Sequence, residues 1–73
     1  MIKLKIKNVN RKYLIALLDV LHKHYTVRCE CEKPRFSSTF FLRVEGEDEE
    51  QFIREIQSFC SQVGWETGVE ERR

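Results

Sequence analysis

The chain has 73 residues, of which 41% are hydrophobic and 34% are charged, and its formal net charge is +1. That length allows one small domain, and the composition excludes a collagen-like repeat, a disordered tail and a disulfide-dense scaffold. No apolar run reaches the roughly 20 residues that span a bilayer, and the first residues lack the continuous apolar stretch of a signal peptide. Three cysteines without a secretory signal favour a reducing, cytoplasmic location.

Charge is divided unevenly along the chain. Residues 1–28 have seven basic residues and one acid, a balance of +6, whereas residues 45–73 have nine acids and three basic residues, a balance of −6. Two interpretations stay open. One is a face that binds nucleic acid or an acidic protein, and the other is charge complementarity across a single small surface.

Apolar spacing predicts six elements in the order β-α-β-β-α-β. Residues 2–7 alternate apolar residues with lysine, which is typical of a strand with one buried face. Residues 11–24 have apolar residues at helical spacing and follow two asparagines, either of which can cap a helix. Residues 25–32 and 38–45 alternate again, and the loop at 33–37 between them contains the only proline.

The second half of the chain predicts a helix and a short strand. Asp48 starts the helix, with Gln51 at the spacing of a capping box and Gly64 as the residue that ends it. Its expected buried stripe comprises Phe52, Ile53, Ile56, Phe59, Cys60 and Val63. Residues 65–69 alternate as a last strand, and a disordered C-terminus is the alternative.

This order predicts an α+β fold that forms a single domain over residues 1–73. With right-handed crossovers it gives a ferredoxin-like two-layer sandwich, in which a four-stranded antiparallel sheet of order 4-1-3-2 carries two helices on one face. The two central strands then place lysines, an arginine and Phe41 on the open face, bordered by acids from the edge strands. This fold has many functions, so it does not identify an activity.

Residues 4–9 are similar to the short motif on the first strand of the RNA-recognition motif family, which implies that central-strand aromatics stack on single-stranded RNA. Here Lys5 occupies the position of a stacking aromatic in that family, and Phe41 is the remaining candidate platform. The basic residues of the open face and the 33–37 loop can also bind phosphates without sequence preference. The alternative is a solvated lysine face that opposes aggregation.

Metal binding and catalysis have little support. Zinc accepts histidine and cysteine ligands, and the sequence has His22, His24, Cys29 and Cys31 close together. Two histidines at i and i+2 on a helix point in different directions. Two cysteines at i and i+2 on a strand have Cα atoms roughly 6.6 Å apart, with parallel side chains. Cys60 lies on the expected inner stripe, and nothing places a base beside it. G-x-G-x-x-G, P-loop and H-E-x-x-H motifs are absent. We therefore expect no enzyme activity, cofactor or metal.

The sequence favours a small non-catalytic binding module of the adaptor, regulator or inhibitor type that acts through protein–protein interaction. The expected partner is another protein or a second copy of the chain, not a membrane, and the alternative is nucleic-acid binding by the basic sheet face. The expected partner-binding residues are Lys3, Lys5, Lys7, Lys33, Arg35, Phe41 and Arg43. A helical site stays open because several apolar residues have no assigned place in the core, namely Tyr13, Ile15, Val20, Tyr25 and Phe36.

Overall fold

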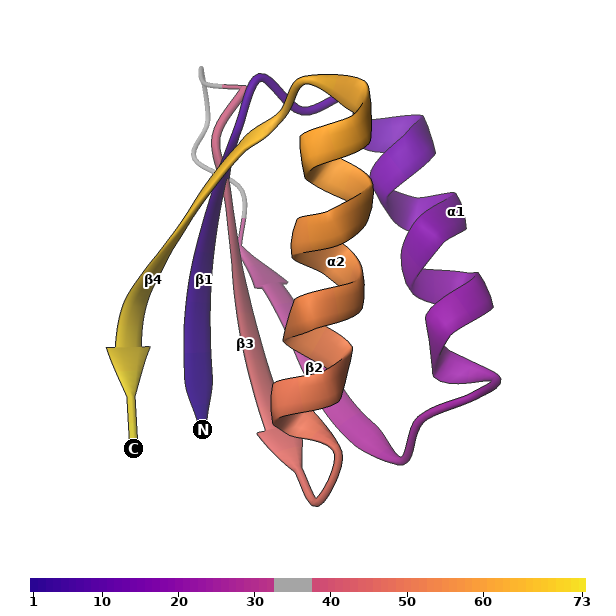
Figure 1. Cartoon of the computed structure of the whole chain (residues 1–73), viewed down its shortest axis with the longest axis vertical. Coiled ribbons are helices and arrows are strands. Elements are labelled where there is room, and N and C mark those ends of the chain that lie inside the picture. The colour runs from indigo at the N-terminus through magenta and orange to yellow at the C-terminus, as the bar shows by residue number, and fades with distance from the viewer. Residues whose placement is uncertain (33–37) are drawn as a thin grey trace.

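The computed structural model describes residues 1–32 and 38–73 as one sheet covered by two helices (Figure 1). All strand pairs are antiparallel, and the strand order is β2-β3-β1-β4. The expected α+β class is confirmed, and the strand order agrees with the predicted order 4-1-3-2 read from the other edge. The elements are β1 (Ile2–Lys7), α1 (Arg11–His22), β2 (Val27–Glu32), β3 (Phe40–Gly46), α2 (Glu49–Val63) and β4 (Glu66–Arg72).

The alternation in β1 separates core from solvent as predicted. Ile2, Leu4 and Ile6 are fully buried, while the lysines between them point to the other face of the sheet. β3 repeats the pattern, and both helices pack on the apolar side of these central strands (Figure 1). The fully buried set also includes Leu14, Leu42, Val44, Phe52, Ile53, Ile56 and Cys60. Within the described ranges, no helix is long and apolar enough to cross a bilayer.

The two helices contribute unequally to this core. α1 buries only Leu14 and Leu21, while Leu17 and Leu18 are half-buried against the core. α2 buries four residues, and its Phe52 ring contacts the rings of both His22 and Tyr25 from the end of α1. Phe52 of α2 therefore contacts both the last residue of α1 and the segment that follows this helix.

The start of α1 depends on Asn10. Its side-chain oxygen accepts a hydrogen bond from the backbone N–H of Lys12 at 3.1 Å, which satisfies one of the free donors of the first turn. We expect Asn10→Ala to lower the free energy of unfolding by about 1 kcal/mol, measured by urea denaturation. Asp48→Ala is the matched control, because the Asp48 side chain makes no such bond. An equal loss in both variants would contradict this role for Asn10.

The ends of α2 show one correction and one confirmation. The capping box predicted from Asp48 and Gln51 is wrong, because Asp48 has φ −96° and ψ 19° rather than the extended backbone of a capping residue. Gly64 does end the helix, with φ 81° and its N–H donating to the carbonyl of Cys60. Val63 was expected in the core but is 47% exposed, since it is the last helical residue and the chain turns away directly after it.

β4 is longer than the predicted strand. It pairs with β1 from Glu66 opposite Lys7 to Arg72 opposite Ile2, with a bulge opposite the step between Lys3 and Leu4. The alternative of a disordered C-terminus is therefore wrong. The Arg72 guanidinium also forms an ion pair with Glu50, which links the end of β4 to the first turn of α2.

Candidate functional site

The open face of the sheet brings together five of the seven predicted partner-binding residues. Lys3 lies opposite Arg43, and Lys5 lies opposite Phe41, on the paired central strands β1 and β3. Lys7 continues the β1 row at its exposed end. The remaining two predicted residues, Lys33 and Arg35, lie outside the described residues.

Two of these side chains already have neighbours within the domain. The Lys3 Nζ lies 5.1 Å from the centre of the Phe41 ring, a cation–π distance. A guanidinium nitrogen of Arg43 lies 3.2 Å from a carboxylate oxygen of Glu32 on β2. Because a lysine covers the Phe41 ring, this ring is a poor platform for a nucleic-acid base.

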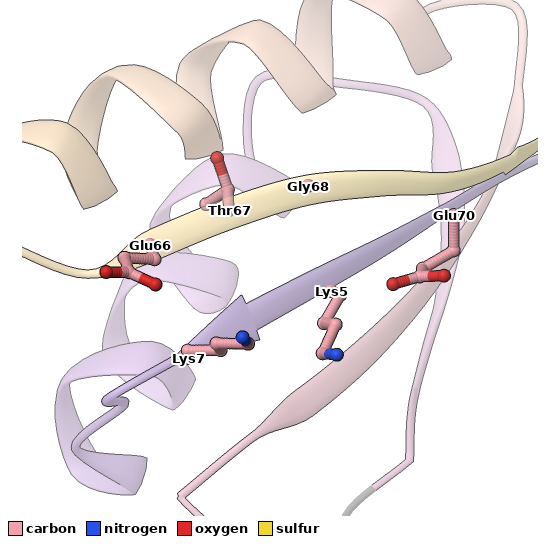
Figure 2. Close-up of a pocket in the computed structure, with 6 residues that line it drawn as sticks. All are labelled: Lys5, Lys7, Glu66, Thr67, Gly68 and Glu70. Carbon is pink, nitrogen blue, oxygen red and sulfur yellow. The ribbon is translucent and has the colours of Figure 1, made fainter.

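Acidic residues flank the lysine row along β4. A shallow pocket of about 240 Å³ is lined by Lys5 and Lys7 of β1 and by Glu66 and Glu70 of β4. Figure 2 shows these four side chains on the same face of the two strands. Gly68 lies opposite Lys5, and its missing side chain leaves the pocket open. On the other side of the face, β2 adds Glu30 and Glu32 together with Arg28. A phosphate backbone laid along the lysines would therefore run beside two acidic borders.

The helical side of the molecule is different, because it exposes large apolar side chains. Tyr13 is 63% exposed and Val20 is 52% exposed, on the same 12-residue helix. Between α1 and α2 lies a groove of about 330 Å³ with an apolar lining, here named the α1–α2 groove. Its lining residues are Tyr13, Ala16, Leu17 and Val20 of α1 and Phe59 of α2.

A second apolar groove lies on the other flank of α1. This α1–β2 groove has a volume of about 220 Å³ and includes Ile15, Leu18 and the exposed thiol residue Cys31 of the edge strand β2. Ile15 is 48% exposed. α1 therefore presents apolar surface in two directions besides the core.

The histidines and cysteines do not converge on a site in the described ranges, where no group of three or more metal-ligand residues occurs. The His22 ring donates from Nδ1 to the carbonyl oxygen of Leu18 at 2.8 Å and packs on Phe52. Burial, with Cys31 and Glu30 nearby, raises the pKa of Cys29 to about 11, and burial raises that of Cys60 to about 11. These thiols are therefore protonated near neutral pH and are poor nucleophiles.

Sequence reasoning found parts of the α1–α2 groove but not the groove itself. Tyr13 and Val20 lacked a place in the core, whereas Phe59 was assigned to the buried stripe. The missed signal is the spacing of residues 13, 16, 17 and 20, which is the i, i+3, i+4, i+7 pattern of a helical packing seam. Tyr25, also unassigned, packs on Phe52 at 6.0 Å between ring centres.

Comparison of the chain with protein-family models, with curated proteins and with solved structures finds no match.

Proposed function

We propose that the protein is a non-catalytic protein-binding module with a ferredoxin-like fold, and that its α1–α2 groove receives an amphipathic helix of a partner protein. The observation that carries this proposal is the apolar lining of the groove, with two of its large side chains more than half exposed. Contiguous exposed apolar surface, in contrast to isolated residues, is typical of protein interaction sites. The fold name rests on the element order and the strand order alone.

The shape of the groove supports a helix as its occupant. The α1 side of the groove is formed by side chains at helical spacing, namely Tyr13, Ala16, Leu17 and Val20. Phe59 forms the α2 side. A third helix with apolar residues at i, i+3, i+4 and i+7 places its own seam against them, as in other helix-in-groove complexes. Ala16 supplies the small residue that allows a close approach.

Charge gives this helix an orientation. Lys12 in the first turn of α1 and Lys23 directly after the helix are both exposed, and the exposed Asp19 lies between them on the same stripe, so this flank of α1 has two basic residues against one acid. Glu55 precedes Phe59 by one helical turn on α2 and is also exposed. A partner helix with an acidic flank along α1 therefore complements the groove.

Binding through the open sheet face remains a prediction for the same protein. Its lysines and Arg43 suit an acidic partner, but their acidic borders and the Lys3–Phe41 contact favour the groove as the main site. Nucleic-acid binding by this face is the alternative function. It is an outcome of the test below.

The test uses synthetic peptides with the protein in solution. One peptide is an amphipathic helix with the i, i+3, i+4, i+7 apolar pattern and a glutamate flank, and a second has a lysine flank. Trp65 is the only tryptophan of the sequence, and its ring centre lies 5.6 Å from that of the groove residue Phe59. Its fluorescence therefore reports occupation of the groove. We expect the glutamate peptide to bind more tightly, and Val20→Asp to weaken its binding at least about tenfold.

The matched control is Ile15→Asp, a similar change at a similarly exposed position on the other flank of α1. It should leave peptide affinity unchanged. Failure of both peptides to bind, or equal losses in the two variants, would overturn the groove proposal. Binding of single-stranded RNA that weakens steeply with salt and is lost in Lys5→Glu/Arg43→Glu would instead favour the nucleic-acid function.

A further inference from the structure

The outer edge of β2 is the second surface that lacks a partner within the described part of the chain. β2 is an edge strand of the sheet, and among the described residues its only strand neighbour is β3. An open edge of this kind presents backbone donors and acceptors to any other strand. We propose that two copies of the chain pair through β2, antiparallel and around a two-fold axis at Cys29, into a continuous eight-stranded sheet.

The sequence of β2 restricts the alignment of the two copies. A two-fold axis perpendicular to the sheet must lie between the two β2 strands, level with a residue that then faces its own copy, because residues on opposite faces cannot pair. An axis at Arg28 places two arginines opposite each other, and an axis at Glu30 places two glutamates opposite each other. An axis at Cys29 places Arg28 of each copy opposite Glu30 of the other copy. This alignment therefore gives two pairs of opposite charge and no like-charge pair in β2.

The neighbouring strand extends this complementarity. Within one copy, Arg28 lies opposite Glu45, and Glu30 lies opposite Arg43. In the proposed dimer, four side chains therefore lie side by side across four adjacent strands of the open face. They are Glu45 of β3 and Arg28 of β2 from one copy, followed by Glu30 of β2 and Arg43 of β3 from the second copy. The charges alternate across four strands, which is favourable for cross-strand neighbours.

Apolar surface on the helical side matches the same arrangement. Cys31 is exposed on the edge strand, and it lies opposite Val27 of the second copy in this alignment. The α1–β2 groove runs beside the edge, with Ile15 and Leu18 at its wall. Two-fold pairing brings both copies of this groove to the same side of the extended sheet, where burial of their apolar side chains stabilises the dimer.

The opposite edge of the sheet does not offer this self-complementarity. β4 has Glu66, Glu70 and Glu71 against the single basic residue Arg72. Pairing two copies there would bring together two acid-rich strands, which repel each other. The second copy therefore belongs at β2.

The test is a charge exchange measured by sedimentation equilibrium of the full chain over a wide range of concentration. We expect the unmodified protein to dimerise, and Arg28→Glu or Glu30→Arg alone to raise the dimer dissociation constant about tenfold. The exchange Arg28→Glu/Glu30→Arg should restore the original value. The same changes place a glutamate opposite Glu45 and an arginine opposite Arg43 inside each copy, so thermal stability of the monomer should fall most in the double variant.

In the double variant the dimer dissociation constant should recover while monomer stability falls, so the two measurements separate dimerisation from folding. Glu66→Arg on β4 is the control, and it should not change the dissociation constant. A monomer at all concentrations, a double variant no better than the single ones, or equal weakening by Glu66→Arg would overturn the proposal. The α1–α2 groove lies on the other flank of α1, so peptide binding should persist in the β2 variants. Loss of dimerisation with retained peptide binding thus leaves the proposed function intact.

Discussion

Replacement of Phe52 by alanine is expected to lower the free energy of unfolding by about 3–5 kcal/mol. Phe52 is fully buried, and its ring contacts His22 at 5.5 Å and Tyr25 at 6.0 Å between ring centres. The substitution removes core volume and also the contact that holds the end of α1. For a domain of this size, whose total stability is on the order of 4–11 kcal/mol, that is a large share.

Urea denaturation followed by far-ultraviolet circular dichroism measures the loss. Phe52→Leu provides a milder variant if the alanine variant does not fold, and we expect it to lose about 1–1.5 kcal/mol. Tyr13→Ala, at an exposed aromatic residue of α1, should change stability by less than about 0.5 kcal/mol. A loss below about 1 kcal/mol in Phe52→Ala would show that α1 is held by other contacts.

Gly46→Ala is expected to lower the free energy of unfolding by about 2–3 kcal/mol. Gly46 has φ +150°, a backbone conformation that residues with a side chain rarely adopt. A Cβ atom there would lie 2.7 Å from the carbonyl oxygen of Thr26 and 3.0 Å from the Cα of Val27. Both are backbone atoms at the entry to β2, so the strand must shift to accommodate a methyl group.

Gly68→Ala is the matched control on the same sheet. A Cβ at Gly68 meets nothing within 4 Å, and the residue has no positive φ. We expect a change within about 0.5 kcal/mol, or a slight gain because alanine restricts the unfolded chain. Equal losses at the two glycines would contradict the proposed clash at Gly46.

The element order and the inner faces of the central strands were predictable from sequence because the relevant signals are local. Ile2, Leu4 and Ile6 alternate with lysine, and that alternation alone decides which side of β1 enters the core. Gly64 likewise ends α2 through its own backbone freedom. These features depend on residues a few positions apart.

The errors concern features that depend on distant parts of the chain. The half-burial of Phe59 depends on where α1 lies beside α2, which helical periodicity does not report. The extension of β4 to Arg72 depends on pairing with β1, which outweighs the weak strand preference of a glutamate-rich segment. The α1 side of the α1–α2 groove follows helical spacing in the sequence, but the groove also requires Phe59 of α2, which lies far along the chain.

The small buried contribution of α1 affects how the domain opens. Elements with few buried contacts detach at a lower free-energy cost than the rest of a domain, and α1 buries only Leu14 and Leu21. A ligand that binds the closed form alone raises the cost of that local opening by mass action. Binding of a partner on either side of α1 would thus turn a weakly attached helix into a firmly held one.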